Sequence, residues 1–218
     1  MKIYAEFFEE GQNVFRKRTY LQFGSSWDLI GSAVLKNPGS AGQEKHQVSS
    51  EIFKKIKKFE DDINLSVKNW FQVSSDPTMS FLAKIFDGSY IGKSVELKGV
   101  IQLFNLFNIK DPNLISAKKK LSRSNSRYLY SDPTVIIKSF KDKPVFLGWG
   151  KEYSNKFVEK NAEEIFEYVV KEKWNYLERE IESNKFYHPQ YINVKNKNEK
   201  IGILLNHFWK SSDFKSSI

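Results

Sequence analysis

Ile30-Gly31-Ser32-Ala33-Val34-Leu35 is a nearly continuous apolar run that leads directly into Lys36-Asn37-Pro38-Gly39. Such a run, closed by a Gly/Pro loop, is typical of a strand that is buried on both faces. Two further runs have the same character: Val100-Ile101-Gln102-Leu103-Phe104-Asn105 and Val145-Phe146-Leu147-Gly148-Trp149. We therefore expect these three segments to form the core strands.

Amphipathic segments lie between and beyond these runs. A helix is expected from Ser49 or Ser50 to about Trp70, and a short one over Met79–Phe86. The longest helix is expected from Ser154 to Ser183. Core strands that alternate with helices predict an α/β fold, here a three-layer α/β/α sandwich with a small, mainly parallel central sheet.

The two ends of the chain have different characters. Residues 1–25 predict an N-terminal hairpin, because two segments rich in Phe, Tyr and Val flank the turn Glu10-Gly11-Gln12-Asn13. Residues 207–218 are expected to be a frayed tail. With no internal repeat and no linker, we expect one domain over residues 1–218.

Composition narrows the class of protein. The absence of cysteine excludes disulfides and Cys-based zinc or iron–sulfur sites, and the three histidines are too far apart in sequence to suggest a metal site. No cofactor is therefore expected. The N-terminus lacks the apolar run of a signal peptide, and no window approaches the roughly 18 apolar residues of a membrane span. We expect a cytoplasmic protein that does not enter membranes.

The chain is basic, with a net charge of +9. A basic protein favours polyanions, with DNA or RNA first among them. The alternative is that a Lys- and Asn-rich composition simply reflects an AT-rich genome. We expect a monomer that has DNA as its partner.

Three loops are the expected place for chemistry. In parallel α/β sheets the ligand lies outside the carboxyl ends of the strands. This rule selects Asn37-Pro38-Gly39, the segment after Asn105, and Gly148-Trp149-Gly150. We expect these three loops to lie near one another.

The first of these loops has the residues of a ligand-binding turn. Gly39 and Gly42 permit a close approach of backbone to ligand, and the backbone N–H groups around Ser40 could bind phosphate or sugar. The Asn37 side chain is suited to orienting a water molecule. The alternative is a tight turn that uses Asn and Pro for conformation alone.

Three polar residues outside this loop are further candidates. Asn105 ends an apolar strand, and its amide offers the donor and acceptor that a pyrimidine edge requires; a buried structural Asn is the alternative. His188, held extended by Pro189, could donate a hydrogen bond to an anionic leaving group, or simply lie in a surface loop. Asp76 is either a general base or a turn or helix cap before Pro77.

The segment from Lys118 to Arg127 carries basic residues and no acid. Its cations could form an arm that contacts phosphates, and its Ser and Asn side chains would add hydrogen-bond donors. A solvated helix end is the alternative. The candidate phosphate contacts are Lys118, Lys119, Lys120, Arg123, Arg127 and, in the first loop, Ser40.

Five short motifs follow one another along the chain between residues 30 and 192. In order they are Asn37-Pro38-Gly39-Ser40-Ala41, Asp76-Pro77-Thr78, Asn105-Leu106-Phe107, Gly148-Trp149-Gly150 and His188-Pro189-Gln190-Tyr191. The series resembles an uncharacterised bacterial and phage family, a domain of unknown function with Asn-Pro-Ser-Thr-Ala, Asp-Pro-Thr, Asn-Leu-Phe, Trp-Gly and His-Pro-Leu-Tyr motifs. Each motif is weak alone, and five in order are considerably more specific.

The same layout resembles the uracil-DNA glycosylase superfamily, in its thymine- and mismatch-directed branch. The resemblance implies that Asn37 positions the hydrolytic water, that Asn105 reads the base and that His188 holds the leaving base. It places Pro38 and Gly39 beside the base. It also implies a stacking aromatic between Asn37 and Asn105 in the sequence, for which Phe71, Phe81 and Phe86 are the candidates.

The chain departs from that superfamily at two loops. Ala41 stands where a Thr is expected after Ser40, and Gln190-Tyr191 replaces the Ser-Pro that follows the late histidine in uracil enzymes. Substrate identity is therefore not inherited. We expect a monofunctional DNA glycosylase that flips out and hydrolytically excises a modified or non-standard pyrimidine, such as one found in phage DNA during antiviral defence. The alternatives are a non-catalytic module that senses modified DNA, and a nucleoside or nucleotide hydrolase.

Overall fold

The structure is a computed structural model. It describes residues 1–42, 45–60, 65–150, 153, 155–172, 186–195 and 197–211. The strands are β1 (Lys2–Glu10), β2 (Asn13–Phe23), β3 (Leu29–Leu35), β4 (Lys45–Gln47), β5 (Trp70–Val73), β6 (Gly99–Asn105) and β7 (Val145–Leu147). The helices are α1 (Ser50–Glu60), α2 (Pro77–Phe86), α3 (Leu114–Leu121), α4 (Pro133–Lys138), α5 (Lys156–Lys171), α6 (Pro189–Lys195) and α7 (Glu199–Ser211), with short 3₁₀ turns at Val67–Asn69 and Ser89–Ile91.

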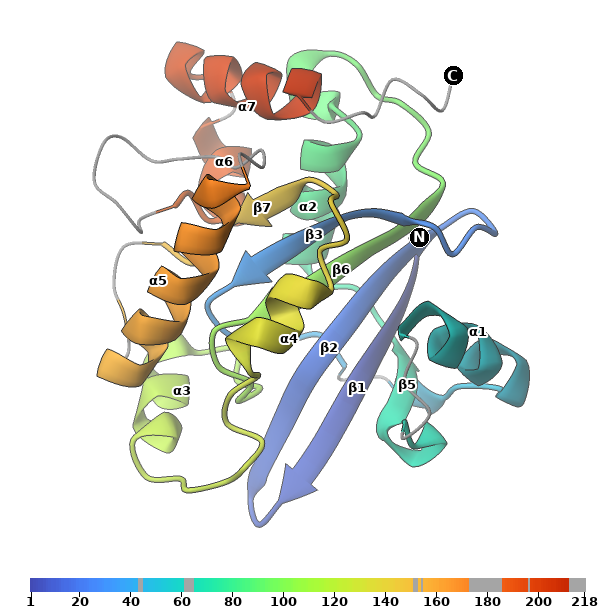
Figure 1. The fold of residues 1–218 in the computed structure, drawn as a ribbon, viewed down its shortest axis with the longest axis vertical. Coiled ribbons are helices and arrows are strands. Elements are labelled where there is room, and N and C mark those ends of the chain that lie inside the picture. Colours follow the sequence, from blue (N-terminus) through green and yellow to red (C-terminus); the bar gives the residue numbers. More distant parts are fainter. Residues whose placement is uncertain are drawn as a thin grey trace.

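Within these residues the strands form one mixed sheet in the order β4-β5-β1-β2-β6-β3-β7 (Figure 1). The three strands expected in the core are neighbours, and β3 pairs in parallel with both β6 and β7. The other pairings are antiparallel. The α/β class is confirmed, but the expectation of a mainly parallel sheet is wrong. The N-terminal hairpin causes the difference, because β2 pairs with β6 and so makes the hairpin the centre of the sheet.

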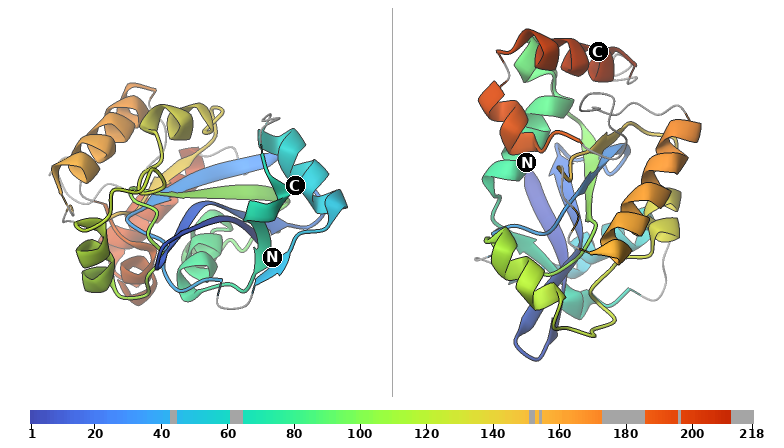
Figure 2. Two further views of the ribbon diagram at one scale, coloured as in Figure 1. Left: turned by 90° about the horizontal axis from the view of Figure 1, so that it is seen from below. Right: turned by 90° about the vertical axis from the view of Figure 1, so that its left-hand side faces the viewer.

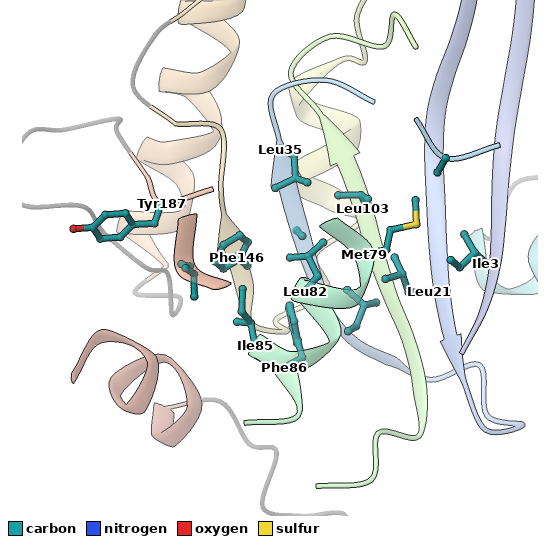
Figure 3. Packing of buried hydrophobic residues seen from close by; sticks show 14 of the residues in the cluster. Ile3, Leu21, Leu35, Met79, Leu82, Ile85, Phe86, Leu103, Phe146 and Tyr187 are labelled. Atoms are coloured by element: carbon teal, nitrogen blue, oxygen red, sulfur yellow. The ribbon is translucent and has the colours of Figure 1, made fainter. Parts of the chain in front are cut away.

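Helices cover both faces of this sheet (Figures 1 and 2). On one face α2, α6 and α7 bury apolar side chains against β3, β6 and the hairpin. Figure 3 shows Met79, Leu82 and Phe86 of α2 beside Leu35 of β3 and Leu103 of β6. On the opposite face, α3, α4 and α5 pack at one side of the sheet and α1 at the other.

The observed helix boundaries differ from the expected ones where residues pair in a strand instead. The helix α1 is described over Ser50–Glu60, and residues 61–64 of the expected helix lie outside the described part of the chain. Trp70, expected at the helix end, instead begins β5, where its ring stacks on Tyr20 at 5.0 Å. Pairing of β5 with β1 satisfies the backbone there. In the longest expected helix, α5 occupies Lys156–Lys171, and the expected continuation over 173–183 lies outside the described residues.

The C-terminal segment also differs from expectation. Residues 207–211, expected to begin a frayed tail, are the end of α7. The reason is apolar burial: Phe208 packs edge-on against Phe86 at 5.5 Å between ring centres, and Trp209 is also buried. The rest of the expected tail, residues 212–218, lies outside the described part of the chain. No helix in the described ranges is both long and apolar enough to cross a bilayer.

A bulge in β2 determines which side chains face which layer. The pairing of β1 with β2 runs Ala5 to Thr19 and then Phe7 to Arg16, so β2 holds one extra residue there. A bulge reverses the alternation of side chains along the strand. Arg16 therefore lies on the face of Phe7 and α2, whereas Arg18 lies on the face of α1, where it pairs with Glu60.

Candidate functional site

A cavity of about 370 Å³ opens at the carboxyl ends of the parallel strands. Leu35 and Leu103 form part of its floor, and the loops after β3, β6 and β7 form its rim together with α2 and the segment that begins α6. This convergence confirms that the three loops lie near one another. The volume lies within the range of roughly 300–1,000 Å³ that is typical of small-molecule pockets.

Hydrogen bonds tie the rim loops together. The Asn37 Nδ2 group donates to the carbonyl oxygens of Pro38, at 3.0 Å, and of Asp111, at 3.3 Å. The Asp111 N–H donates in turn to the Pro38 carbonyl oxygen. Asn37 thus uses its amide N–H groups to join the loops after β3 and β6. In the described part of the chain its Oδ1 has no partner, and the side chain lines the cavity.

Gly148 sets the distance between the loops after β3 and β7. A Cβ atom at this position would lie 2.4 Å from Cε1 of Phe146 and 2.8 Å from Cδ2 of Leu35. Its N–H donates to the Val34 carbonyl oxygen at 2.8 Å. The lack of a side chain therefore allows the loop to lie directly on β3. Two residues later, the Gly150 N–H donates to the carbonyl oxygen of Phe186, which brings in the segment leading to His188.

Asp76 is buried at the start of α2 and contributes to the cavity wall. Its Oδ1 accepts a hydrogen bond from the Met79 N–H at 3.0 Å, which makes it the N-cap of α2 with Pro77 in the first turn. A Cβ atom placed on Gly39 would lie 3.3 Å from the other oxygen, Oδ2. One carboxylate oxygen therefore caps the helix, and the other faces the loop after β3.

His188 also lines the cavity, immediately before α6. Its Nδ1 accepts a hydrogen bond from the Gln190 N–H at 3.2 Å, which assigns the ring proton to Nε2. Burial, and then the nearby Lys36 ammonium, lower the pKa of His188 to about 4, with Asp76 acting in the opposite direction. At neutral pH the ring is therefore uncharged and carries a donor at Nε2.

Arg16 is a charged cavity residue that sequence reasoning missed. It is only 2% exposed, and Nη1 donates to the Ala41 carbonyl oxygen at 3.3 Å. Burial lowers its pKa to about 10, partly offset by Asp76, so the guanidinium stays charged at neutral pH. The only signal in the sequence is a basic run, Arg16-Lys17-Arg18, within an otherwise aromatic hairpin. Simple alternation assigns Arg16 and Arg18 to one face, and only the bulge separates them.

Asn105 ends β6 beside Leu35, in the expected strand position. It is 1% exposed, and neither Nδ2 nor Oδ1 has a hydrogen-bond partner in the described part of the chain. It lies on the same face of β6 as Leu103, two residues earlier, which lines the cavity. Asn105 itself is not among the residues that line the cavity.

None of the three aromatic candidates for base stacking lines the cavity. Phe86 is fully buried against Phe208 and Gly31, far along α2 from its capped start. Phe71 packs on Phe7 beside a different surface pocket, and Phe81 lies partly buried on α2. The aromatic ring on the wall is Trp149, which is 1% exposed and packs edge-on against Phe186. Sequence order alone could not distinguish these rings.

The remaining predicted site residues surround the cavity. Pro38 is buried in the loop after β3, and Ser40 is half-buried next to Gly39; neither forms part of the wall. Lys118, Lys119 and Lys120 occupy the last turn of α3, whose first residue, Leu114, lines the cavity. Lys120 pairs with Asp111 of the rim at 2.8 Å. Further on, Arg123 is exposed, and Arg127 donates to the Tyr128 hydroxyl at 2.8 Å.

No described group of three His, Asp or Glu side chains is placed to hold a metal ion. Comparison with protein-family models, with curated proteins and with solved structures returns no match for this chain.

Proposed function

We propose that the protein is a DNA glycosylase, which hydrolyses the N-glycosidic bond of a modified or non-standard pyrimidine nucleotide flipped into the cavity. The observation that carries this proposal is the meeting of Asp76 and His188 in one cavity. A carboxylate and a neutral imidazole N–H donor have complementary roles in hydrolysis. The first acts on water, and the second acts on the departing base.

His188 would act on the base. As the glycosidic bond loosens, negative charge accumulates on the ring of the departing base, and an N–H aimed at that charge lowers the barrier. Nε2 carries the proton because Nδ1 is occupied by the Gln190 N–H. The low pKa of His188 means that this donor is present throughout the neutral pH range. The imidazole therefore stabilises the leaving base through a hydrogen bond and not through a full positive charge.

Asp76 would act on the water. Its Oδ1 is used by the α2 cap, whereas Oδ2 lies on the side of Gly39 and is available to accept a proton from water. The Asn37 Oδ1 atom, on the same rim, is a second acceptor that could orient this water. A carboxylate is the better proton acceptor of the two, so we assign the base to Asp76 and water orientation to Asn37.

The lysines of α3 would hold the DNA. They lie in the last turn of a helix that starts on the cavity rim at Leu114, so a polyanion bound along α3 would pass the cavity mouth. Cationic side chains that contact phosphates position a nucleic acid without reading its sequence. This arrangement supports a polymeric substrate.

Base release tests the proposal. Duplexes that contain uracil, DNAs with natural phage base modifications, and unmodified DNA are incubated with the protein, and abasic sites and free bases are measured by mass spectrometry. We expect release of one base. Salt-sensitive DNA binding without any release would instead indicate a non-catalytic sensor of modified DNA.

A second candidate is a hydrolase that acts on free nucleotides. The buried, charged Arg16 on the cavity wall favours it, because an anionic group small enough to enter the cavity would reach this side chain. Salt dependence separates the two candidates. A DNA enzyme loses affinity for DNA steeply as salt rises, because counterions are released on binding. A free-nucleotide enzyme binds DNA weakly at every salt concentration.

A further inference from the structure

Buried polar atoms without partners are concentrated at one place in the sheet. In the described residues, six buried side-chain nitrogen or oxygen atoms lack a hydrogen-bond partner, and four of them belong to Arg16, Thr19 and Asn105. Native structures leave few such atoms unsatisfied, and a cluster of them points to a missing ligand or to ordered water.

Strand pairing places these three side chains on one face. Thr19 pairs with Leu103 across β2 and β6, and Asn105 lies two residues beyond Leu103 on the same face. Arg16 lies beyond the bulge of β2 on this face, opposite Phe7, and its N–H donates to the carbonyl oxygen of Asn108, just after β6. Thr19 and Asn105 therefore lie beside Leu103, which lines the cavity, and Arg16 itself reaches the wall.

Arg16 carries a buried charge, and two carboxylates, Asp76 and Asp111, share the cavity wall with it. Arg16 has no carboxylate within ion-pair distance in the described part of the chain; the carboxylate that acts on it through space is Asp76. Lys36 lines the same cavity, and Lys110 lies close enough for the Arg16 charge to help lower its pKa, after the larger effect of burial. A buried guanidinium with one hydrogen bond is costly unless an anion joins it.

We propose that Arg16 forms an oxyanion subsite on the wall of the cavity, with the unpartnered polar atoms of Asn105 and Thr19 on the same face of the sheet, and that this subsite holds the phosphate of a nucleotide. The guanidinium supplies the charge and paired donors that phosphate favours. The phosphate part of this proposal is independent of the proposed function. Only the nucleoside part of the ligand rests on the proposed function.

Binding of inorganic phosphate, followed by calorimetry at low ionic strength, is the direct test. Wild-type protein is expected to bind phosphate saturably, and Arg16→Gln to bind it at least about tenfold more weakly. The matched control is Lys138→Gln, which removes one charge from the exposed end of α4 and should leave affinity unchanged. No binding by wild-type protein, or equal binding by Arg16→Gln, overturns the subsite.

A second variant keeps the test decisive where Arg16→Gln does not fold. Asp76→Asn removes the negative charge that faces Arg16 and preserves an oxygen for the α2 cap. We expect it to bind phosphate several-fold more tightly than wild-type protein. Unchanged or weaker binding by Asp76→Asn contradicts a subsite at Arg16.

Matched ligands identify the source of the phosphate. Deoxyuridine monophosphate is compared with deoxyuridine, and an oligonucleotide that carries a 5′-phosphate with the same oligonucleotide lacking it. A gain from the phosphate that is absent in Arg16→Gln supports the subsite, in a free nucleotide or at a DNA end respectively. No gain in either pair contradicts it. Phosphate binding without base release from any substrate would remove the glycosylase proposal and leave the subsite; base release without phosphate binding would do the reverse.

Discussion

Asp76 directs one carboxylate oxygen into the start of α2 and the other toward Gly39, where a Cβ atom would lie 3.3 Å away. The helix cap thereby fixes the carboxylate against the loop after β3. The same residue then serves folding through Oδ1 and is available for chemistry through Oδ2. This division makes the two roles separable by substitution.

Gly39→Ala should reduce activity more than stability. The added methyl would meet Oδ2 of Asp76 closer than ordinary van der Waals contact, and would displace the carboxylate or the water beside it. We expect a loss of at least several-fold in the rate of base release and a change in unfolding free energy within about 1 kcal/mol. Kinetics and urea unfolding measure the two effects.

Gly202→Ala is the control, because a Cβ atom there meets nothing within 4 Å. It lies in α7 and should stabilise the protein by about 0.5–1 kcal/mol with activity unchanged. Equal rates of base release for Gly39→Ala and wild-type protein would mean that Oδ2 of Asp76 takes no part in the reaction.

The cap itself predicts a difference between Asp76→Ala and Asp76→Asn. Alanine removes the acceptor for the Met79 N–H and should cost about 1 kcal/mol of unfolding free energy, whereas asparagine keeps the acceptor and should cost less. Asp132 caps α4 before Pro133, so Asp132→Ala and Asp132→Asn should show the same difference in unfolding free energy. If Asp76→Asn is as destabilised as Asp76→Ala, the carboxylate is held by interactions other than the cap.

The low pKa of His188 predicts a pH dependence of stability. The folded protein holds this ring with a pKa of about 4, below the ordinary value of 6.5. Between these values the unfolded chain binds a proton that the folded chain does not, so stability falls as the pH drops from 6.5 toward 4. The share due to His188 is on the order of 1–3 kcal/mol.

His188→Asn tests this share, because the Asn Oδ1 atom can accept the Gln190 N–H in place of Nδ1. Urea unfolding at pH 7 and pH 4.5 should show a smaller drop in stability for the variant than for wild-type protein. His46→Asn, at an exposed position on β4, should show the full drop. An identical drop in all three proteins would mean that His188 titrates normally.

The basic segment predicts a salt-dependent interaction with DNA. Lys119 and Arg123 are exposed at and beyond the end of α3. Replacing both with Gln should flatten the slope of log affinity against log salt by about 0.9 for each phosphate that the protein no longer neutralises. Fluorescence anisotropy at several salt concentrations measures the slope, with Lys138→Gln as control. A slope equal to that of wild-type protein would mean that DNA does not bind at Lys119 and Arg123.

Sequence patterns predicted the three buried strands and their shared edge, because continuous apolar runs that end in Gly and Pro loops are local signals. The mixture of parallel and antiparallel strands in the sheet was not predictable in this way. Whether the hairpin lies at an edge or in the centre depends on the pairing of β2 with β6, residues about 80 positions apart, which no local pattern encodes. Trp70 shows the same limit, since helical spacing extends through a residue that pairs in β5.

The site was predicted in part for similar reasons. Asn37, Gly39, Asp76 and His188 stand next to Pro or Gly in loops, and all four reach the cavity. Arg16 stands in a strand, and only an extra residue in β2 turns it toward the cavity and away from Arg18. Asn105 was placed at the correct strand end, but its burial away from the cavity wall depends on packing that the sequence does not display.

The most direct test of the account is the single-turnover rate of base release from the best DNA substrate, measured for wild-type protein, Asp76→Asn and Asp132→Asn. Both variants replace the capping Asp of an Asp-Pro-Thr helix start, and only Asp76 lies in the cavity. We predict a rate at least about 100-fold lower for Asp76→Asn and an unchanged rate for Asp132→Asn. Equal rates for the two variants, or no base release from any DNA by wild-type protein, would contradict a glycosylase centred on Asp76 and His188.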